Sequence, residues 1–261
     1  MNRIDLKFSE LKERGEKALI PFITSGDPDL DTTLKLVIAM EEAGADIIEL
    51  GIPYSDPLAD GPTIQASSNR SLKGGTKIAN IMDTVKKIRQ RTEVPLVYLV
   101  YYNSIFKYGM EKFIRECGEC GVDGIIIPDL PIEERKDIAA IGKEYNVHLI
   151  PLVAPTSKER IKKIVKDAGG FVYCVSVNGV TGTRSSINTD IEEYMNIISS
   201  YTDVPKALGF GISSAEMAAK FKPYCEGIIV GSAVIKKIEA GKSKDDIIEN
   251  VRKFIRELKL A

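Results

Sequence analysis

The stretch DIIELGIPYSDPLADGP, residues 46–62, joins an apolar strand-like run to a loop rich in proline and aspartate. The period of a strand places Ile47, Glu49 and Gly51 on one face of that run. We expect this face to point into the core, where burial raises the pKa of the Glu49 carboxyl above its reference value. Such a carboxyl is a candidate general acid or base. A structural ion pair or an exposed strand edge is the alternative interpretation of Glu49.

Seven more strand-like runs alternate with amphipathic helical stretches along the 261 residues. Eight strands that alternate with helices predict an α/β protein, a single (β/α)₈ TIM barrel over residues 1–261. We expect an extra helix over residues 4–11, and helix N-caps at Ser213 and Ser243. An open doubly wound sheet is the alternative fold. The eight runs are residues 18–24, 46–52, 95–101, 124–129, 148–153, 171–177, 204–210 and 227–232.

The charge and hydropathy patterns disfavour several classes of partner. The formal net charge is −1, and Lys and Arg form no block, which argues against a nucleic-acid surface. Apolar runs are shorter than a membrane span requires. Residues 1–17 are charged and lack the apolar segment of a signal peptide, so we expect a cytoplasmic protein.

The few cysteines and the one histidine limit the chemistry. Cys117 and Cys120 form a C-x-x-C motif, which is typical of a redox pair or of half a zinc site. They also share one face of a helical stretch, so we favour two buried core cysteines. His148 is the only histidine, and it lies in a strand pattern typical of a structural role. We therefore expect no metal site, and we expect acid–base chemistry to depend on carboxylates, Tyr or Lys.

Glycine-bearing turns follow the last three strand-like runs. They are NGVTGTR after residue 177, GFGISS with Gly209 and Gly211, and VGSA with Gly231 and Ser232. Glycine lets a backbone approach an anion, and helix N-termini supply free N–H groups. Because barrels commonly bind phosphate after their last two strands, we predict a phosphate-bearing small-molecule substrate. Tight strand-to-helix turns without a ligand are the alternative.

Further candidates lie near the ends of the strand-like runs. Asp60 is placed to reach the same end of the barrel as Glu49, although an ordinary turn aspartate fits the pattern equally, and Asp56 before Pro57 suits a turn. Aromatic residues at the strand ends are expected either to fill the core or to line a pocket for a flat apolar group. These aromatic residues are Phe22, Tyr101, Tyr102, Tyr173 and Phe210.

The whole chain resembles the tryptophan synthase alpha subunit family. The most specific motif is ADIIELGIPYSDPLADGPTIQ, residues 45–65. The other matching motifs, PFITSGDPD, PDLP, NGVTGT, GFGIS and GSA, follow the family order along the chain. The resemblance implies a (β/α)₈ barrel that cleaves indole-3-glycerol phosphate to indole and glyceraldehyde 3-phosphate, without a cofactor of its own.

The resemblance also assigns roles to residues. Glu49 is the acid and base, Asp60 accepts the indole N–H, and Thr181 helps to order the loop after the sixth run. The phosphate is expected on the backbone of Gly182, Gly211, Gly231 and Ser232, and the indole among Phe22, Tyr101, Tyr173 and Phe210. No role follows for Arg184.

The same resemblance implies a partner, a beta subunit that carries pyridoxal phosphate and receives indole in an alpha-beta-beta-alpha complex. The loop with Pro53 and Asp56 is expected to face it. Two other hypotheses stay open from the sequence. One is a Schiff-base aldolase with Lys206, although that residue lies at the start of its strand. The other is a barrel that serves only as an activator or scaffold.

Overall fold

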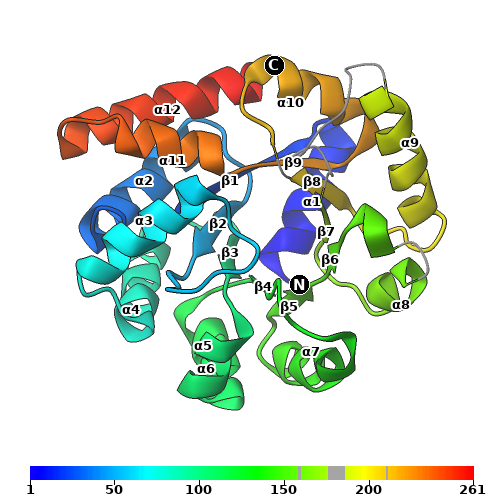
Figure 1. The fold of residues 1–261 in the computed structure, drawn as a ribbon, viewed down its shortest axis with the longest axis horizontal. Coiled ribbons are helices and arrows are strands. Elements are labelled where there is room, and N and C mark those ends of the chain that lie inside the picture. The colour runs from blue at the N-terminus through cyan, green and yellow to red at the C-terminus, as the bar shows by residue number, and fades with distance from the viewer. Residues whose placement is uncertain (158–159, 176–185, 210) are drawn as a thin grey trace.

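The strands form one parallel sheet that closes into a barrel, with helices around it (Figure 1). The computed structural model describes residues 1–157, 160–175, 186–209 and 211–261, and only the backbone of residues 186–190. The strands are β1 (Ala18–Thr24), β2 (Ile48–Gly51), β3 (Leu96–Leu99), β4 (Gly124–Ile126), β5 (His148–Ile150), β6 (Leu152–Val153), β7 (Val172–Val175), β8 (Lys206–Gly209) and β9 (Gly227–Val230).

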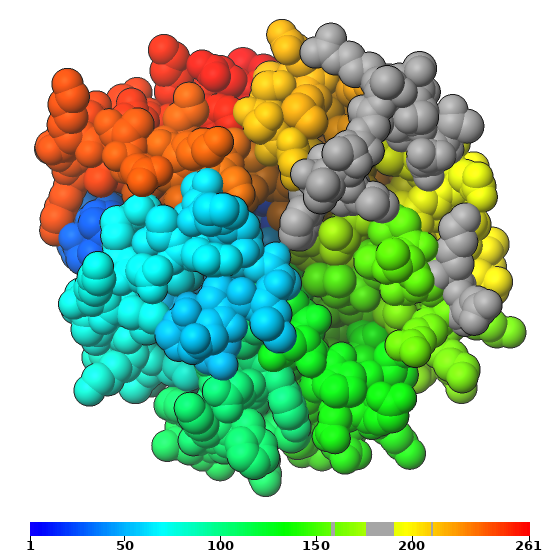
Figure 2. Space-filling view, viewed as in Figure 1, coloured from blue at the N-terminus to red at the C-terminus, as the bar shows by residue number. Residues whose placement is uncertain are grey.

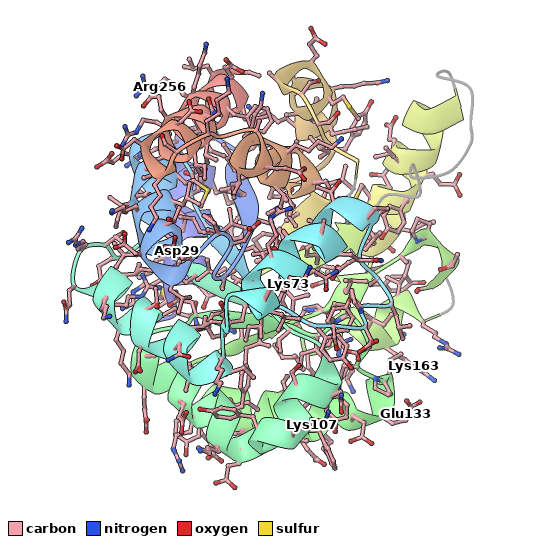
Figure 3. All side chains as sticks on the ribbon, turned by 60° about the vertical axis from the view of Figure 1, so that its left-hand side comes forward. Asp29, Lys73, Lys107, Glu133, Lys163 and Arg256 are labelled. Carbon is pink, nitrogen blue, oxygen red and sulfur yellow. The ribbon has the colours of Figure 1, made fainter. Side chains whose placement is uncertain are left out.

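Helices occupy the outer ring and carry their charged side chains to the surface. In Figure 3, Arg256 lies at the upper left of the molecule, across from Lys107 and Lys163 at the lower right. The helices are α1 (Arg3–Arg14), α2 (Leu30–Glu42), α3 (Pro62–Lys73), α4 (Ile78–Arg89), α5 (Tyr102–Tyr108), α6 (Met110–Cys120), α7 (Arg135–Glu144), α8 (Ile161–Val165), α9 (Ser186–Ser199), α10 (Ala215–Phe221), α11 (Ser232–Glu239) and α12 (Lys244–Leu260). Short 3₁₀ turns are η1 (Ile132–Glu134), η2 (Pro155–Ser157) and η3 (Lys222–Tyr224). In the part of the chain that is described, no helix has the length and apolar character to cross a membrane.

Ring closure occurs at Pro151, which divides the predicted run 148–153 into β5 and β6. Proline has no N–H to donate to a ladder, so a strand is interrupted there. The residues before Pro151 pair with β4, and those after it pair with β7. The two ends of the nine-strand order are therefore one continuous chain segment. The predicted (β/α)₈ barrel is confirmed, and the open sheet is excluded.

The register fixes which side chains point into the barrel. Phe22 of β1 pairs with Glu49 of β2, which pairs with Val97 of β3. Ile47 and Val97 belong to the cluster inside the barrel, whereas Ile48 packs in the larger cluster between sheet and helices. The alternation predicted for β2 is confirmed, and Glu49 faces inward.

The N-terminal helix α1 closes one end of the barrel. Phe8 is buried against Phe171, with 5.9 Å between the ring centroids. Asn2 caps the helix by accepting a bond from the N–H of Ile4, and its amide donates to the carbonyl oxygen of Asp123 at 2.8 Å. Because this end is filled, a ligand has to enter from the end where the strands have their C-termini.

We predict that Phe8→Ala lowers the free energy of unfolding by about 3 kcal/mol, since it leaves a cavity beside Phe171. Urea denaturation monitored by circular dichroism measures the change. Leu6→Ala on the exposed side of α1 is the matched control and is expected to change stability by less than about 0.5 kcal/mol. Equal losses in both variants would contradict a closing role for the buried face of α1.

Candidate active site

A cavity of about 650 Å³ lies at the open end of the barrel. Its wall comes from β1, β2, β3, β7 and β9, from the loops after β2 and β8, and from α3, α11 and α12. A site at the C-terminal ends of the strands is the usual place for ligands in a parallel barrel. Both carboxyls singled out in the sequence, Glu49 and Asp60, line this one cavity.

Glu49 is a buried carboxyl with no hydrogen-bonding partner for either oxygen among the described residues. Its side chain is 1% exposed. Burial, with a smaller contribution from the Asp60 carboxylate, raises the pKa of Glu49 to about 8. The group therefore holds its proton near neutral pH and can both give up and take back a proton.

Asp60 ends the loop after β2 and is partly buried. Burial raises the pKa of Asp60, while hydrogen bonding with the Tyr101 hydroxyl opposes that change. The Tyr101 oxygen also accepts a bond from the Ala59 N–H at 3.1 Å, and its ring stacks on Tyr54 with centroids 5.0 Å apart. Tyr101 thus helps to fix the position of Asp60 through this hydrogen bond.

Two aromatic rings form the inner walls, Phe22 from β1 and Tyr173 from β7. Each ring packs against a glycine of a neighbouring strand, where a side chain would not fit. A Cβ at Gly51 would lie 2.6 Å from the Phe22 ring, and a Cβ at Gly209 would lie 2.7 Å from the Tyr173 ring. Sequence reasoning identified both rings but not this need for Gly51 and Gly209. The available signal was an isolated glycine inside a strand, which indicates close approach by a neighbour.

The turns after β8 and β9 form another part of the cavity wall. Gly211 has φ 77°, a left-handed conformation that favours glycine. Gly231 precedes the first turn of α11, and Ser232 is its first residue. The first N–H groups of a helix have no partner within it and carry the positive end of its dipole. Since Gly211, Gly231 and Ser232 all line the cavity, they form a candidate anion-binding wall.

Tyr101, which was predicted to line the indole pocket, is not among the residues of the cavity wall, and other predicted residues are not described. Thr181, Gly182, Arg184 and Phe210 lie outside the described residues, and their roles stay predictions. On the loop after β2, Asp56 is exposed and Pro53 is buried. Their contact with a partner also stays a prediction.

The residues of the alternative hypotheses lie elsewhere. Lys206 is the first residue of β8, and its ammonium lies 3.3 Å from the Glu226 carboxylate, far from the open end. His148 pairs with Asp5 of α1 at 2.9 Å. Cys117 and Cys120 are free thiols in the core, and burial raises the pKa of both. The structural interpretations of His148 and the cysteine pair are confirmed. Among the described residues, no cluster of three or more potential ligands suits a metal ion.

The fold and cavity define a (β/α)₈ barrel with a neutral buried carboxyl at the open end. The model of the tryptophan synthase alpha chain family matches residues 8–261, so the chain belongs to this family. A tryptophan synthase alpha chain from Clostridium kluyveri is 64% identical over 259 residues, covering 99% of this chain and 98% of the relative. One from a Thermoanaerobacter species is 63% identical over 259 residues, covering 99% of both chains.

Solved structures of tryptophan synthase alpha chains have the same fold as this chain. Tryptophan synthase subunit alpha from Legionella pneumophila superposes with a TM-score of 0.92 at 33% identity, covering 100% of this chain and 98% of that one. A chain from the tryptophan synthase a2b2 complex of Pyrococcus furiosus gives 0.85 at 39% identity, covering 92% and 97%. These proteins are similar to this chain in fold over nearly its whole length.

We predict that the protein becomes less stable as pH rises, because of Glu49. Between its reference pKa of 4.5 and about 8, the folded chain holds a proton that the unfolded chain has lost. The free energy of unfolding therefore decreases as pH rises through this window, by at most ~1.4 kcal/mol per pH unit. Glu49→Gln removes this slope, whereas Glu257→Gln, on the exposed side of α12, keeps it. Urea titrations from pH 5 to 9 measure both, and parallel curves for wild type and Glu49→Gln would contradict the assignment.

Proposed function

We propose that this chain is a carbon–carbon lyase that cleaves indole-3-glycerol phosphate to indole and glyceraldehyde 3-phosphate, in tryptophan biosynthesis. The observation that carries the proposal is the neutral Glu49, which has no hydrogen-bonding partner in the described part of the chain and faces the same cavity as Asp60. Membership of the tryptophan synthase alpha chain family supports the substrate that the sequence resemblance implies. The cavity offers two carboxyls, two aromatic walls and an anion-binding wall, which are the groups that this substrate needs.

The reaction needs one carboxyl that first donates a proton and later accepts one. The neutral Glu49 donates its proton to indole carbon C3, which leaves a positive charge shared with the ring nitrogen. The carboxylate then takes the proton of the adjacent side-chain hydroxyl. The hydroxyl carbon becomes the aldehyde, the carbon–carbon bond breaks, and its electron pair restores the aromatic ring. Glu49 ends protonated, as it began, so the chain needs no cofactor for this cycle.

Asp60 supports the charged intermediate. Its carboxylate would accept the indole N–H and stabilise the positive charge that develops on the ring. The Tyr101 hydroxyl supports this role, because hydrogen bonding favours the ionised form of Asp60. Phe22 and Tyr173 would hold the flat ring between these carboxyls, and Gly211, Gly231 and Ser232 would bind the phosphate.

The proposal includes a partner, a beta subunit that consumes indole and holds pyridoxal phosphate. The tryptophan synthase of Pyrococcus furiosus forms an a2b2 complex with mutual activation. On this chain, the loop after β2 exposes Leu58 beside α5, which exposes Phe106. The Asn103 amide donates to the Tyr54 hydroxyl at 3.0 Å and so connects loop and helix. Exposed apolar side chains on this loop and on the helix connected to it suit a docking surface.

We expect Glu49→Gln to lower indole release by at least about 10³-fold, since the amide cannot exchange the proton. Asp60→Asn is expected to lose about 10²-fold, because it removes charge stabilisation but not the proton donor. Indole release is measured for the isolated chain and with a beta subunit. Binding of indolepropanol phosphate is the control and should persist in both variants. Near-normal turnover in Glu49→Gln would overturn its role, and a wild-type chain that never releases indole would favour a scaffold.

For the partner, we expect Leu58→Asp to weaken association with a beta subunit at least about tenfold, because it places a charge in an apolar contact. Leu260→Asp, at another exposed leucine at the end of α12, is the control and should leave association unchanged. Sedimentation or calorimetric titration measures both. Unchanged affinity in Leu58→Asp would exclude this loop tip from the interface.

A further inference from the structure

The cavity continues past the anion-binding wall and runs along the exposed side of α11. Lys236, Lys237 and Ala240 line this outer part together with Phe254 of α12. From Ser232 to Ala240 the helix rises ~12 Å, at 1.5 Å per residue. Figure 2 shows the neighbouring surfaces, with the cyan atoms of α3 bordering the orange atoms of α11. The outer part is therefore a path between the anion-binding wall and solvent.

Charge is separated along this cavity. At the inner end, the described wall holds Glu49, which is protonated near neutral pH, and Asp60, whose carboxylate supplies the negative charge. At the outer end, its cations are Lys236 and Lys237. A ligand with an anionic end is repelled from the inner end and attracted to the outer one, so the two ends select its orientation.

The two lysines differ in what holds them. The Lys237 ammonium lies over the Phe254 ring, 5.1 Å from its centroid. Lys236 is exposed and has no ion-pair or hydrogen-bonding partner in the described part of the chain. Glu239, three residues on, would be its natural partner on the helix. Glu239 instead pairs with Arg70 of α3 at 3.4 Å, and Arg70 in turn binds the buried Asp27.

Lys236 also lies on the helix face that points to the anion-binding wall. It follows Ser232 by four residues, so the two side chains share a face. Helical side chains lean toward the N-terminus, which directs the Lys236 chain toward Gly231 and Ser232. An unpaired, flexible ammonium is thus available near the free N–H groups of α11.

We propose that Lys236 is a positioning residue that guides and orients the phosphate end of the substrate. This inference rests on the proposed function, because it assumes that the anion-binding wall receives the phosphate. Lys236 adds a full positive charge, whereas Gly211, Gly231 and Ser232 offer backbone N–H groups, a helix dipole and the neutral Ser232 hydroxyl. It keeps the dianion at the outer end and so leaves the indole next to Glu49. The role is in binding rather than in the proton transfers.

The test compares two ligands that differ only in the phosphate, indolepropanol phosphate and indolepropanol. The chain contains no tryptophan, so indole fluorescence reports the ligand without tryptophan emission from the protein. Dissociation constants are measured for wild type, Lys236→Gln and Lys236→Arg. Lys87→Gln on the outer face of α4 is the control with the same change in net charge. Steady-state indole release from indole-3-glycerol phosphate gives kcat and KM.

We expect Lys236→Gln to weaken binding of the phosphate ester five- to tenfold and to raise KM similarly, with kcat within twofold of wild type. Binding of indolepropanol should not change, Lys236→Arg should restore affinity, and Lys87→Gln should match wild type. The salt dependence of KM should also weaken in Lys236→Gln, because one charge has been removed. A kcat loss without a KM change, or equal weakening for both ligands, would overturn the proposal.

The two proposals fail separately. If wild type binds the phosphate ester in a Lys236-dependent way but releases no indole, the positioning role stands and the lyase reaction is wrong. If wild type releases indole and Lys236→Gln keeps the wild-type KM, the lyase reaction stands and the positioning role is wrong.

Discussion

The burial of one unpartnered carboxyl constrains the rest of this site. Glu49 is 1% exposed and faces no hydrogen-bond donor among the described residues. An ionised carboxylate in that position would be strongly unfavourable, so the group stays protonated instead. That state requires a cavity whose inner walls are apolar, which Phe22 and Tyr173 provide. It also requires the opposite end of the barrel to be filled, which the buried face of α1 achieves.

Most of the fold could be predicted from the sequence, because strand and helix periods depend on local patterns. All eight predicted runs contain strands, and Ser243 caps α12 as expected. The errors have physical causes. Pro151 interrupts a continuous apolar pattern, since periodicity does not register a missing N–H. Ser213 was the wrong cap, because Ser214, one residue later, has the extended backbone and accepts from the Met217 N–H. The capping-box spacing from Ser213 to Glu216 favoured the first of two adjacent serines.

The site was predictable where one strand or one turn places a residue at the open end of the barrel. The alternation in β2 made Glu49 a candidate, and the glycine-bearing turns indicated Gly211, Gly231 and Ser232. The requirement for glycine at positions 51 and 209 was not predicted. It arises because the rings of Phe22 and Tyr173, on neighbouring strands, occupy the space that a Cβ would take. The role of Lys236 was not predicted either, because it also depends on a contact between elements far apart in sequence. On sequence it has Glu239 as an ordinary helical partner, and only the fold brings Arg70 from α3 to take that carboxylate. Contacts between elements far apart in sequence decide which charged groups stay unpaired.

Two carboxyls share the cavity but have different environments, which is how one site can hold an acid and a charge stabiliser together. Glu49 has no hydrogen-bond donor among the described residues, so burial, with a smaller contribution from Asp60, raises its pKa to about 8. Asp60 has the Tyr101 hydroxyl, which opposes the effect of burial. If Glu49 were also ionised, a dianionic ligand would meet two negative charges at the inner end. A neutral Glu49 reduces that repulsion and keeps a proton available. The protonation state that suits catalysis therefore also suits binding of an anion.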